Sequence, residues 1–337
     1  MNVDIILNEF DSPRAIAEQA ALAESYGFRA VWSASYATGR DCFLSLVEAA
    51  QSTSKILLGP LAVSPMELHP VKMTQELLTL NEFCNGRAII TVGAGGGVIE
   101  AMGIKRKNMV ESVRECVEIM RAALTGEDVV YHGDIYTALK FNTRWAKGIP
   151  APQIYVGASQ ERMSYMATEK ADGLMGSDLI HPLIGLTKGW VDDGLTQHGR
   201  EGQPFGISNF WAWHIKRDKE ESMREARREL VLRGVLRRRY TDVLLSKEDS
   251  DFVQENKGIF WRAWETASDK IEGVPDHIVD SLIAGLSSAG DLNDIDREIE
   301  RFKEYEALGL TDIAIRVHDD PVDGIKLIGE HIVPALQ

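Results

Sequence analysis

The sequence predicts a closed (β/α)8 barrel of the TIM type, and three observations lead to this fold. Short apolar segments alternate with helical patterns eight times, which is typical of a parallel sheet with right-handed crossovers. The turn after the first strand, residues 8–12, contains no glycine. The glycine run at 93–97 is followed by Val98, where a dinucleotide fingerprint needs its third glycine. The last two features disfavour the main structural alternative, an open doubly wound sheet.

Local signals mark the ends of the expected elements. Ser12 is placed to cap the first helix, Pro13 lies in its first turn, and Gly27 ends it. The Asn85-Gly86 pair ends the helix before the glycine run. Strands are expected over residues 3–7, 30–33, 56–63, 88–92, 154–156, 173–175, 208–215 and 312–317. Helices are expected over residues 12–26, 42–53, 71–83, 110–124, 161–170, 182–197 and 322–336, with a loop region between 124 and 154.

The segment 218–310 is too long for a single crossover between strands seven and eight. Its pattern is helical, and Trp261 and Trp264 are three residues apart on one face. We expect residues 1–337 to form one barrel domain that carries 218–310 as an inserted helical segment. This segment would pack over the barrel mouth or at a subunit contact.

Composition excludes several classes of protein. With 44% hydrophobic and 26% charged residues, the chain has ordinary globular composition. The net charge of −14 argues against a nucleic-acid partner, and the basic cluster at 224–239 reads as a solvated helix face. Cys42, Cys84 and Cys116 lack metal-ligand spacing, so we expect free thiols and no metal site. No leader and no apolar run of about 20 residues is present, which favours a cytoplasmic protein without a membrane partner.

Two expected strand ends consist mainly of glycine and other small residues. Gly93, Ala94 and Gly95 end strand four, and Gly157, Ala158, Ser159 and Gln160 end strand five and open a helix. In a barrel, function sits where strands end, and free N–H groups at a positive helix end suit a phosphate. The alternative is that the glycines only permit close packing of helix on sheet. We favour phosphate binding.

Polar and aromatic residues follow three further strands. Ser64, Met66 and His69 come after strand three, where His69 is a helix cap or a cofactor contact. Ser177 and Asp178 come after strand six and would reach the polar chain of a cofactor or cap a helix. Trp211 and Trp213 share one face of strand seven and are expected in the core rather than as a stacking platform.

Several motifs in order resemble the bacterial-luciferase-like monooxygenase superfamily. They include Leu58-Gly-Pro-Leu-Ala-Val-Ser-Pro65, His69-Pro70, Leu80-Asn-Glu-Phe-Cys-Asn-Gly-Arg87, Val92-Gly-Ala-Gly95, Ile154-Tyr-Val-Gly-Ala158 and Ala171-Asp-Gly-Leu174. The chain is most similar to the deazaflavin-dependent branch, which includes methylene-tetrahydromethanopterin reductase. The resemblance covers most of the chain and is weak between residues 218 and 310.

The resemblance implies a homodimer that binds FMN or 8-hydroxy-5-deazaflavin (coenzyme F-420) at the barrel mouth. It also implies a non-proline cis peptide bond near Leu61-Ala62, behind the ring. The cofactor contacts expected on this basis, together with the glycine strand ends, are Leu61, Ala62, Ser64, Gly93, Ala94, Gly95, Gly157, Ala158, Ser159 and Ser177.

One departure from the family pattern affects the catalytic assignment. Many deazaflavin relatives carry an Asp-His pair after strand two, where this chain has Ala34 and Ser35, followed by Tyr36. A serine cannot do the acid–base work of a histidine near neutral pH. Either proton transfer comes from another group or the chemistry needs little of it. The candidates are Tyr36, Glu9 and Ser35 itself, with Asn8 and Arg40-Asp41 as further options. The first strand also has Ile6 where the reductases have a carboxylate.

The function expected is that of an oxidoreductase moving a hydride between a deazaflavin and a small organic substrate. One alternative is an FMN-dependent monooxygenase that takes reduced flavin from a separate reductase and uses oxygen. An alternative of another class is a flavin-binding protein without activity, which the missing Asp-His pair motivates. A sugar-phosphate barrel enzyme would need a lysine or carboxylate pair at strand ends, which is not evident. The aromatic residues of the second half favour an apolar or aromatic substrate.

Overall fold

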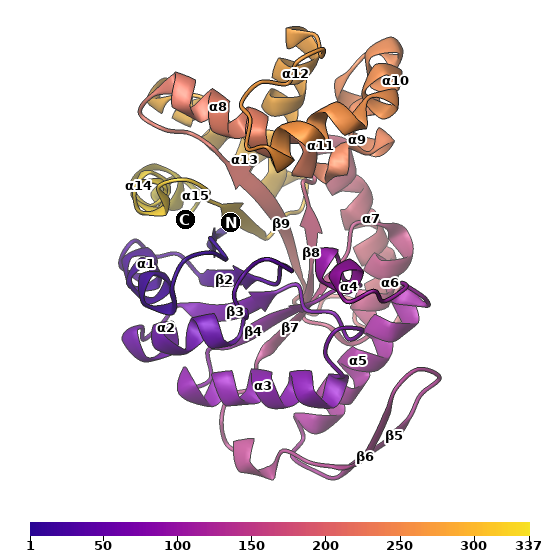
Figure 1. The fold of residues 1–337 in the computed structure, drawn as a ribbon. Helices are drawn as coiled ribbons and strands as arrows, with labels where there is room; N and C mark the ends of the chain where they lie inside the picture. Colours follow the sequence, from indigo (N-terminus) through magenta and orange to yellow (C-terminus); the bar gives the residue numbers. More distant parts are fainter.

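The computed structural model describes residues 1–337, and its centre is a closed barrel of parallel strands (Figure 1). Its strands are β1 (Asn2–Leu7), β2 (Ala30–Ala34), β3 (Leu57–Leu61), β4 (Ile89–Val92), β7 (Gln153–Gly157), β8 (Gly173–Ser177), β9 (Gly206–Trp213) and β11 (Asp312–Arg316). Hydrogen bonds join them in the order β3-β2-β1-β11-β9-β8-β7-β4. Parallel bridges Leu58–Ala88 and Val63–Val92 link β3 to β4 and close the ring. The predicted (β/α)8 barrel is confirmed.

The strands are apolar on both faces because both faces are buried. Side chains alternate between the barrel interior and the layer under the helices. Ile6, Trp32, Ile89, Tyr155 and Met175 belong to an apolar cluster inside the barrel. The opposite faces of the same strands join the large core cluster that the helices cover. The interior is thus filled by side chains rather than hollow.

A buried ion network closes the end of the barrel opposite the mouth. The Arg29 guanidinium contacts Asp4 at 2.6 Å and Asp312 at 2.8 Å, and both carboxylates are almost fully buried. Trp32 Nε1 donates to Asp4 at 2.9 Å, and Tyr155 donates to Asp312 at 3.1 Å. Burial raises the pKa of Asp4 against the opposing charge of Arg29. The network ties four strands together, β1, β2, β7 and β11, far from the glycine strand ends.

Helices cover the barrel in the expected alternation. They are α1 (Pro13–Ser25), α2 (Val47–Ser52), α3 (Pro70–Phe83), α4 (Gly97–Ala101), α5 (Met109–Ala123), α6 (Glu161–Lys170), α7 (His181–Gln197), α14 (Pro321–Leu327) and α15 (Val333–Leu336). Ser12 caps α1, accepting from the Ala15 N–H at 3.2 Å. The helix expected from residue 42 starts later, because Asp41 accepts the N–H groups of Phe43 and Leu44 and opens a short 3-10 turn, η1 (Leu44–Leu46).

Residues 125–153 contain a hairpin, so the expectation of a loop region was wrong for this part. The strands β5 (Val129–His132) and β6 (Thr137–Phe141) pair antiparallel, and the hairpin projects from the body beside α5 (Figure 1). The Glu115 carboxylate of α5 accepts three consecutive N–H groups of its turn, from Asp134 to Tyr136. This contact joins a turn to a distant helix, so no local pattern signals it. A 3-10 turn, η2 (Arg144–Ala146), follows.

Between β9 and β11 the chain forms a helical layer over one end of the barrel (Figure 1). It comprises α8 (Lys219–Glu229), η3 (Leu230–Leu232), η4 (Gly234–Leu236), α9 (Arg238–Leu244), α10 (Lys247–Glu255), α11 (Lys257–Glu265), α12 (Asp276–Leu286), β10 (Ser287–Ser288), η5 (Leu292–Asp294) and α13 (Ile295–Ala307). The α13 helix packs against α7 and α15 and leads into β11, so it occupies the place of a barrel helix. Trp261 and Trp264 form an edge-to-face pair with centroids 6.0 Å apart.

Three smaller expectations concern the backbone, the cysteines and the membrane. Every peptide bond is trans, so the cis bond expected near Leu61-Ala62 is wrong. The trans backbone already pairs on both sides of this bond, because Leu61 O accepts from Ser35 N and Val63 N donates to Thr91 O, and the cis form costs about 3 kcal/mol. The three cysteines are free and buried. No helix combines the length and apolar character that a bilayer span requires.

Candidate functional site

One side of the barrel mouth is a cradle of small residues, which we call the glycine cradle: Ala62, Gly93 and Gly157. These residues end or directly follow β3, β4 and β7. A Cβ built on Gly93 would lie 3.0 Å from the Cβ of Ala62, and one built on Gly157 would lie 3.5 Å from the Cα of Gly93. The three strand ends therefore meet with backbone rather than side chains between them. Such a surface suits a flat ring.

Backbone N–H groups without a protein acceptor follow the cradle on both strands. The amides of Ala94, Gly95 and Gly96 donate to no protein atom, nor do those of Ser159 and Gln160. Helix α6, which starts directly after them, has no side chain capping its N-terminus. Ala158 is buried, and its N–H donates to Met175 O at 3.0 Å. Free amides at an uncapped helix start are the arrangement that binds phosphate.

Leu61 and Ser64, both expected near the cofactor, are buried beneath the loops that follow β3 and β4. Leu61 is buried in the interior cluster under the mouth. Ser64 is fully buried, and its Oγ accepts the Met66 N–H at 3.1 Å. Gly95 has φ +84°, and a Cβ there would lie 2.2 Å from Ile99 and 3.1 Å from Ser64 Oγ. The loop after β4 therefore requires glycine at position 95 on both grounds.

Opposite the cradle, the mouth carries charged side chains. The Arg316 guanidinium, at the end of β11, is buried and forms an ion pair with Glu9 beyond β1. Tyr36, which follows β2, lies near this pair and is exposed at the mouth. Loss of water around its hydroxyl raises the pKa of Tyr36, Arg316 opposes that rise, and the negative charge of Glu9 adds to it. Tyr36 therefore stays protonated at neutral pH.

A second ion pair joins the insertion to the end of β8. Asp178 is buried, has φ +53°, and accepts the Gly234 N–H at 2.7 Å. Arg233 is also buried; its Nη1 lies 3.4 Å from Asp178 Oδ1 and its guanidinium 5.7 Å from the Phe210 ring centroid. Burial raises the pKa of Asp178, and Arg233 opposes the rise. Ser177 Oγ donates to Asp178 at 2.9 Å rather than standing free.

The wall of the mouth opposite the glycine cradle carries charge. Two arginines and two carboxylates, in the pairs Arg316–Glu9 and Arg233–Asp178, line the side opposite the glycine cradle. Trp211 and Trp213 are buried and belong to the large core cluster under the helices. The expected core role of both tryptophans is therefore confirmed.

Most other polar candidates have local structural partners. Ser35 Oγ donates to Glu67 at 3.0 Å, and burial raises the pKa of Glu67. Asn8 accepts the Phe10 N–H at 3.0 Å, and the Arg40 guanidinium donates to Phe10 O. His69 caps α3, with Nδ1 accepting the Val71 N–H at 3.2 Å. Of the three leading acid–base candidates, only Tyr36 has a side chain with no protein hydrogen-bond partner, since Glu9 pairs with Arg316 and Ser35 with Glu67.

Sequence reasoning missed two histidines and two arginines at the mouth. His214 follows β9 directly, and His318 follows β11 by two residues. Their rings stack with centroids 4.9 Å apart. Both histidines follow strand ends, where barrel enzymes carry their functional residues, so position alone could have identified them as site candidates. Arg316 ends β11 and carries the same signal, whereas Arg233 lies in the insertion and carries none. No local pattern indicates the ion-pair partners of these arginines, which lie 307 and 55 residues away.

The arrangement fits a flat cofactor with a phosphate-bearing chain. The ring would lie on the glycine cradle, and the free amides beyond β4 and β7 would receive the phosphate. No group of three or more histidine, cysteine or carboxylate side chains is placed to hold a metal ion. The charged wall would then face the ring from across the mouth.

Comparison with known proteins places this architecture in one family. A family model described as luciferase-like monooxygenase matches residues 3–312. The 5,10-methylenetetrahydromethanopterin reductase of Archaeoglobus fulgidus is 29% identical over 327 residues, covering 94% of each chain. The coenzyme F420 dependent tetrahydromethanopterin reductase of Methanopyrus kandleri superposes with a TM-score of 0.81 at 22% identity, covering 100% of this chain and 99% of that one.

A flavin-bound structure is similar as well. The oxygenating constituent of 3,6-diketocamphane monooxygenase from Pseudomonas putida, in complex with FMN, gives a TM-score of 0.67 at 16% identity, covering 99% of this chain and 98% of that one. The suspected resemblance is thus confirmed, and because the family model matches residues 3–312, the chain belongs to the luciferase-like monooxygenase family.

Proposed function

We propose that this protein is a deazaflavin-dependent oxidoreductase that transfers a hydride to or from a small organic substrate at the barrel mouth. Its family makes it an oxidoreductase of the flavin and deazaflavin class. The observation that carries the proposal is the glycine cradle formed by Ala62, Gly93 and Gly157, which faces the charged wall. When bound, a deazaflavin supplies two-electron hydride chemistry and does not activate oxygen.

One side of the mouth would bind the cofactor, and the opposite side would orient the substrate. Ala62, Gly93 and Gly157 would hold the ring in one plane, and the free amides at 94–96 and 159–160 would anchor the phosphate. The Arg316–Glu9 and Arg233–Asp178 pairs would orient the substrate across from the ring. Fixed charges of this kind act without reorganising during the reaction.

Tyr36 is the proposed proton donor. Its pKa is raised, so the hydroxyl stays protonated near neutral pH, and no protein group accepts its proton. Glu9 is held by Arg316 and Ser35 by Glu67, which leaves neither free for proton transfer. The tyrosine would therefore replace the Asp-His pair expected after the second strand of deazaflavin relatives.

Deazaflavin is favoured over FMN by the similar proteins. The relative from Archaeoglobus fulgidus is a methylenetetrahydromethanopterin reductase, and the F420-dependent structure superposes with a higher TM-score than the FMN-bound monooxygenase. The FMN monooxygenase supplied by a separate reductase remains the second candidate, because both cofactors share the phosphate-bearing chain that the free amides would bind.

Parallel titrations with coenzyme F420 and with FMN, followed by fluorescence, test the proposal. We expect tight F420 binding and weak FMN binding. Preference for FMN would replace the proposal with the monooxygenase, to be assayed with a flavin reductase and oxygen. Tight F420 binding without hydride exchange from any donor would favour the non-catalytic flavin-binding protein. Binding of neither cofactor would show that the glycines serve packing only.

A homodimer is part of the same proposal. Exposed apolar side chains gather over α2 and α3, where Leu44 is 69% exposed and Phe83 and Trp145 are each more than 40% exposed. Burying such a group against a second copy would remove apolar surface from water. Light scattering coupled to size exclusion tests this point, and a monomeric mass would contradict it.

A further inference from the structure

A cavity of about 700 Å³ lies outside the glycine cradle, between the ends of β9 and β11 and the helices α8 and α14. Its lining includes Trp213 from β9, Val317 and His318 beyond β11, and Glu225 from α8. Its volume is ample for a small organic molecule. It adjoins the charged side of the mouth, because its lining residue His318 follows Arg316 by two residues.

His318 lines this cavity, and its ring makes no hydrogen bond within the protein. Its side chain is more than nine-tenths buried, and its Nε2 has no hydrogen-bond partner. An imidazole nitrogen left without a partner in a buried site costs free energy, so such atoms call for a ligand or a water. Burial and the nearby cations, including Arg316, Arg233 and Arg228, hold the pKa of His318 well below its usual value. The imidazole is therefore neutral near pH 7.

The neighbouring histidine is locked in place. His214 Nδ1 lies 2.8 Å from Glu225 Oε1, and Lys216 contacts the other carboxylate oxygen at 2.8 Å. Although burial opposes it, the His214 hydrogen bond and the charges of His214 and Lys216 lower the pKa of Glu225. Glu225 is thus ionised and accepts from Nδ1, which leaves His214 Nε2 unpartnered beside the His318 ring.

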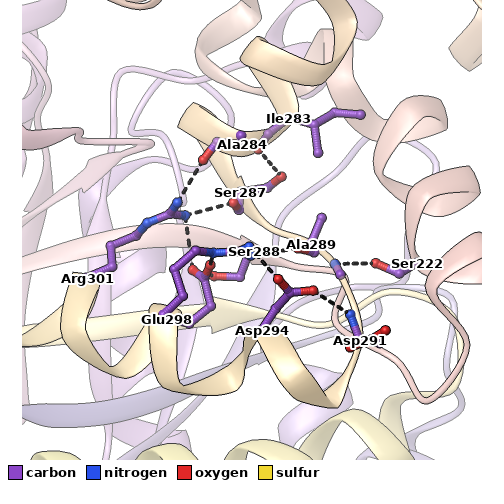
Figure 2. A network of polar contacts seen from close by, with 12 residues as sticks. Ser222, Ile283, Ala284, Ser287, Ser288, Ala289, Asp291, Asp294, Glu298 and Arg301 are labelled. Atoms are coloured by element: carbon purple, nitrogen blue, oxygen red, sulfur yellow. Dashed lines mark hydrogen bonds and ion pairs between the residues drawn. The ribbon is translucent and has the colours of Figure 1, made fainter.

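A polar network around β10 (Figure 2) holds Ser288, the backbone partner of His214. The backbone N–H of His214 donates to Ser288 O at 2.7 Å. Ser288 Oγ donates to the buried Glu298 carboxylate at 2.6 Å, and Arg301 donates to Ser287 O at 2.9 Å. Helix α13 therefore holds β10 against β9, and through β10 it places His214.

The charges around the cavity disfavour an ionic ligand of either sign. Six carboxylates and four cationic side chains line it, so a carboxylate or phosphate would meet an excess of negative charge. A cationic ligand beside His318 would be repelled by the positive charges of the nearby arginines. Three of the four cations already have partners at 2.8–3.3 Å, in the pairs Lys216–Glu225, Arg228–Asp319 and Arg217–Asp323.

We propose that this cavity binds the uncharged, hydroxyl- or carbonyl-bearing part of the substrate, with His318 as the hydrogen-bonding group. A neutral imidazole both donates and accepts, so it pairs equally with an alcohol and with a ketone. This proposal deepens the proposed function and rests on it for the identity of the reaction. The binding itself is a property of the cavity and is measured without the cofactor.

Three probes of equal ring size test the proposal by ligand-observed NMR with the full chain: cyclohexanol, cyclohexanecarboxylate and cyclohexylammonium. We expect cyclohexanol to bind and the two ions to bind at least about tenfold more weakly. His318→Leu should weaken cyclohexanol binding about tenfold, and His318→Asn, which keeps a donor and an acceptor, should retain most of it. His277→Leu, an exposed histidine on α12, is the matched control and should change nothing.

Thermal unfolding of each variant separates loss of binding from loss of fold. Stronger binding of either ion, or unchanged cyclohexanol binding in a folded H318L, would overturn the proposal. If H318L does not fold, the test falls to H318N. A loss of cyclohexanol binding of about tenfold in a folded H318N would then overturn the proposal. F420 titration of the same variants keeps the two proposals apart: intact cofactor binding without cyclohexanol binding refutes only the cavity assignment.

Discussion

Replacing Gly157 with alanine tests the glycine cradle directly. A Cβ at this position would lie 3.5 Å from Gly93 Cα and 3.7 Å from both Thr91 Cγ2 and Val92 O, which is ordinary contact. The backbone of Gly157 is not in the left-handed region, so alanine introduces no strain. G157A should therefore leave the free protein as stable as the parent or raise its stability by about 0.4–1 kcal/mol, because alanine restricts the unfolded chain.

The cofactor complex should respond in the opposite sense. The added methyl group projects from the cradle between β4 and β7, where the ring would have to lie against backbone. Crowding a packed site by one methyl group costs about 1–3 kcal/mol. The dissociation constant for the cofactor should rise roughly fivefold to more than a hundredfold.

Fluorescence titration of G157A with F420 and with FMN, together with thermal unfolding without cofactor, measures both effects. Gly189→Ala on the exposed face of α7 is the matched control, because its added Cβ meets nothing within 4 Å. G189A should gain stability as well and bind cofactor normally. Parental affinity in a well-folded G157A would refute the placement of the ring on the cradle.

Three further outcomes follow from the structure. Glu24 accepts three consecutive backbone N–H groups before β3, and these bonds lower its pKa to about 2 from 4.5 despite partial burial. Because the folded pKa is the lower one, E24Q should cost about 1–3 kcal/mol at neutral pH, and the difference should vanish as the pH falls from about 4.5 to 2 in denaturant titrations. R29M leaves the Asp4 and Asp312 carboxylates buried without a cation and should cost about 3–5 kcal/mol of unfolding free energy; a loss below about 1 kcal/mol would contradict the network. Y36F should lower turnover about a hundredfold or more with unchanged F420 affinity, and full activity would remove Tyr36 from the mechanism.

The elements of the fold that could be predicted were those with local signals. The alternation of strand and helix, the Ser12 cap and the glycine ends of β4 and β7 all lie within a few residues of their effects. The hairpin β5–β6 escaped prediction because its turn is held by Glu115, from a helix earlier in the chain. The cis bond was expected from resemblance alone, and the local pairing of β3 is satisfied without it.

The sequence by itself determined the barrel and the side of the mouth that lacks side chains, because strand periodicity and glycine content are local properties. Only the tertiary structure decided the other side. Arg316 meets Glu9 across 307 residues, and Arg233 of the insertion meets Asp178 at the end of β8. His214 and His318 become neighbours only because β9 pairs with β11. Closure of the barrel brings these strand ends together, and no pattern along the chain encodes which charged residues then face each other.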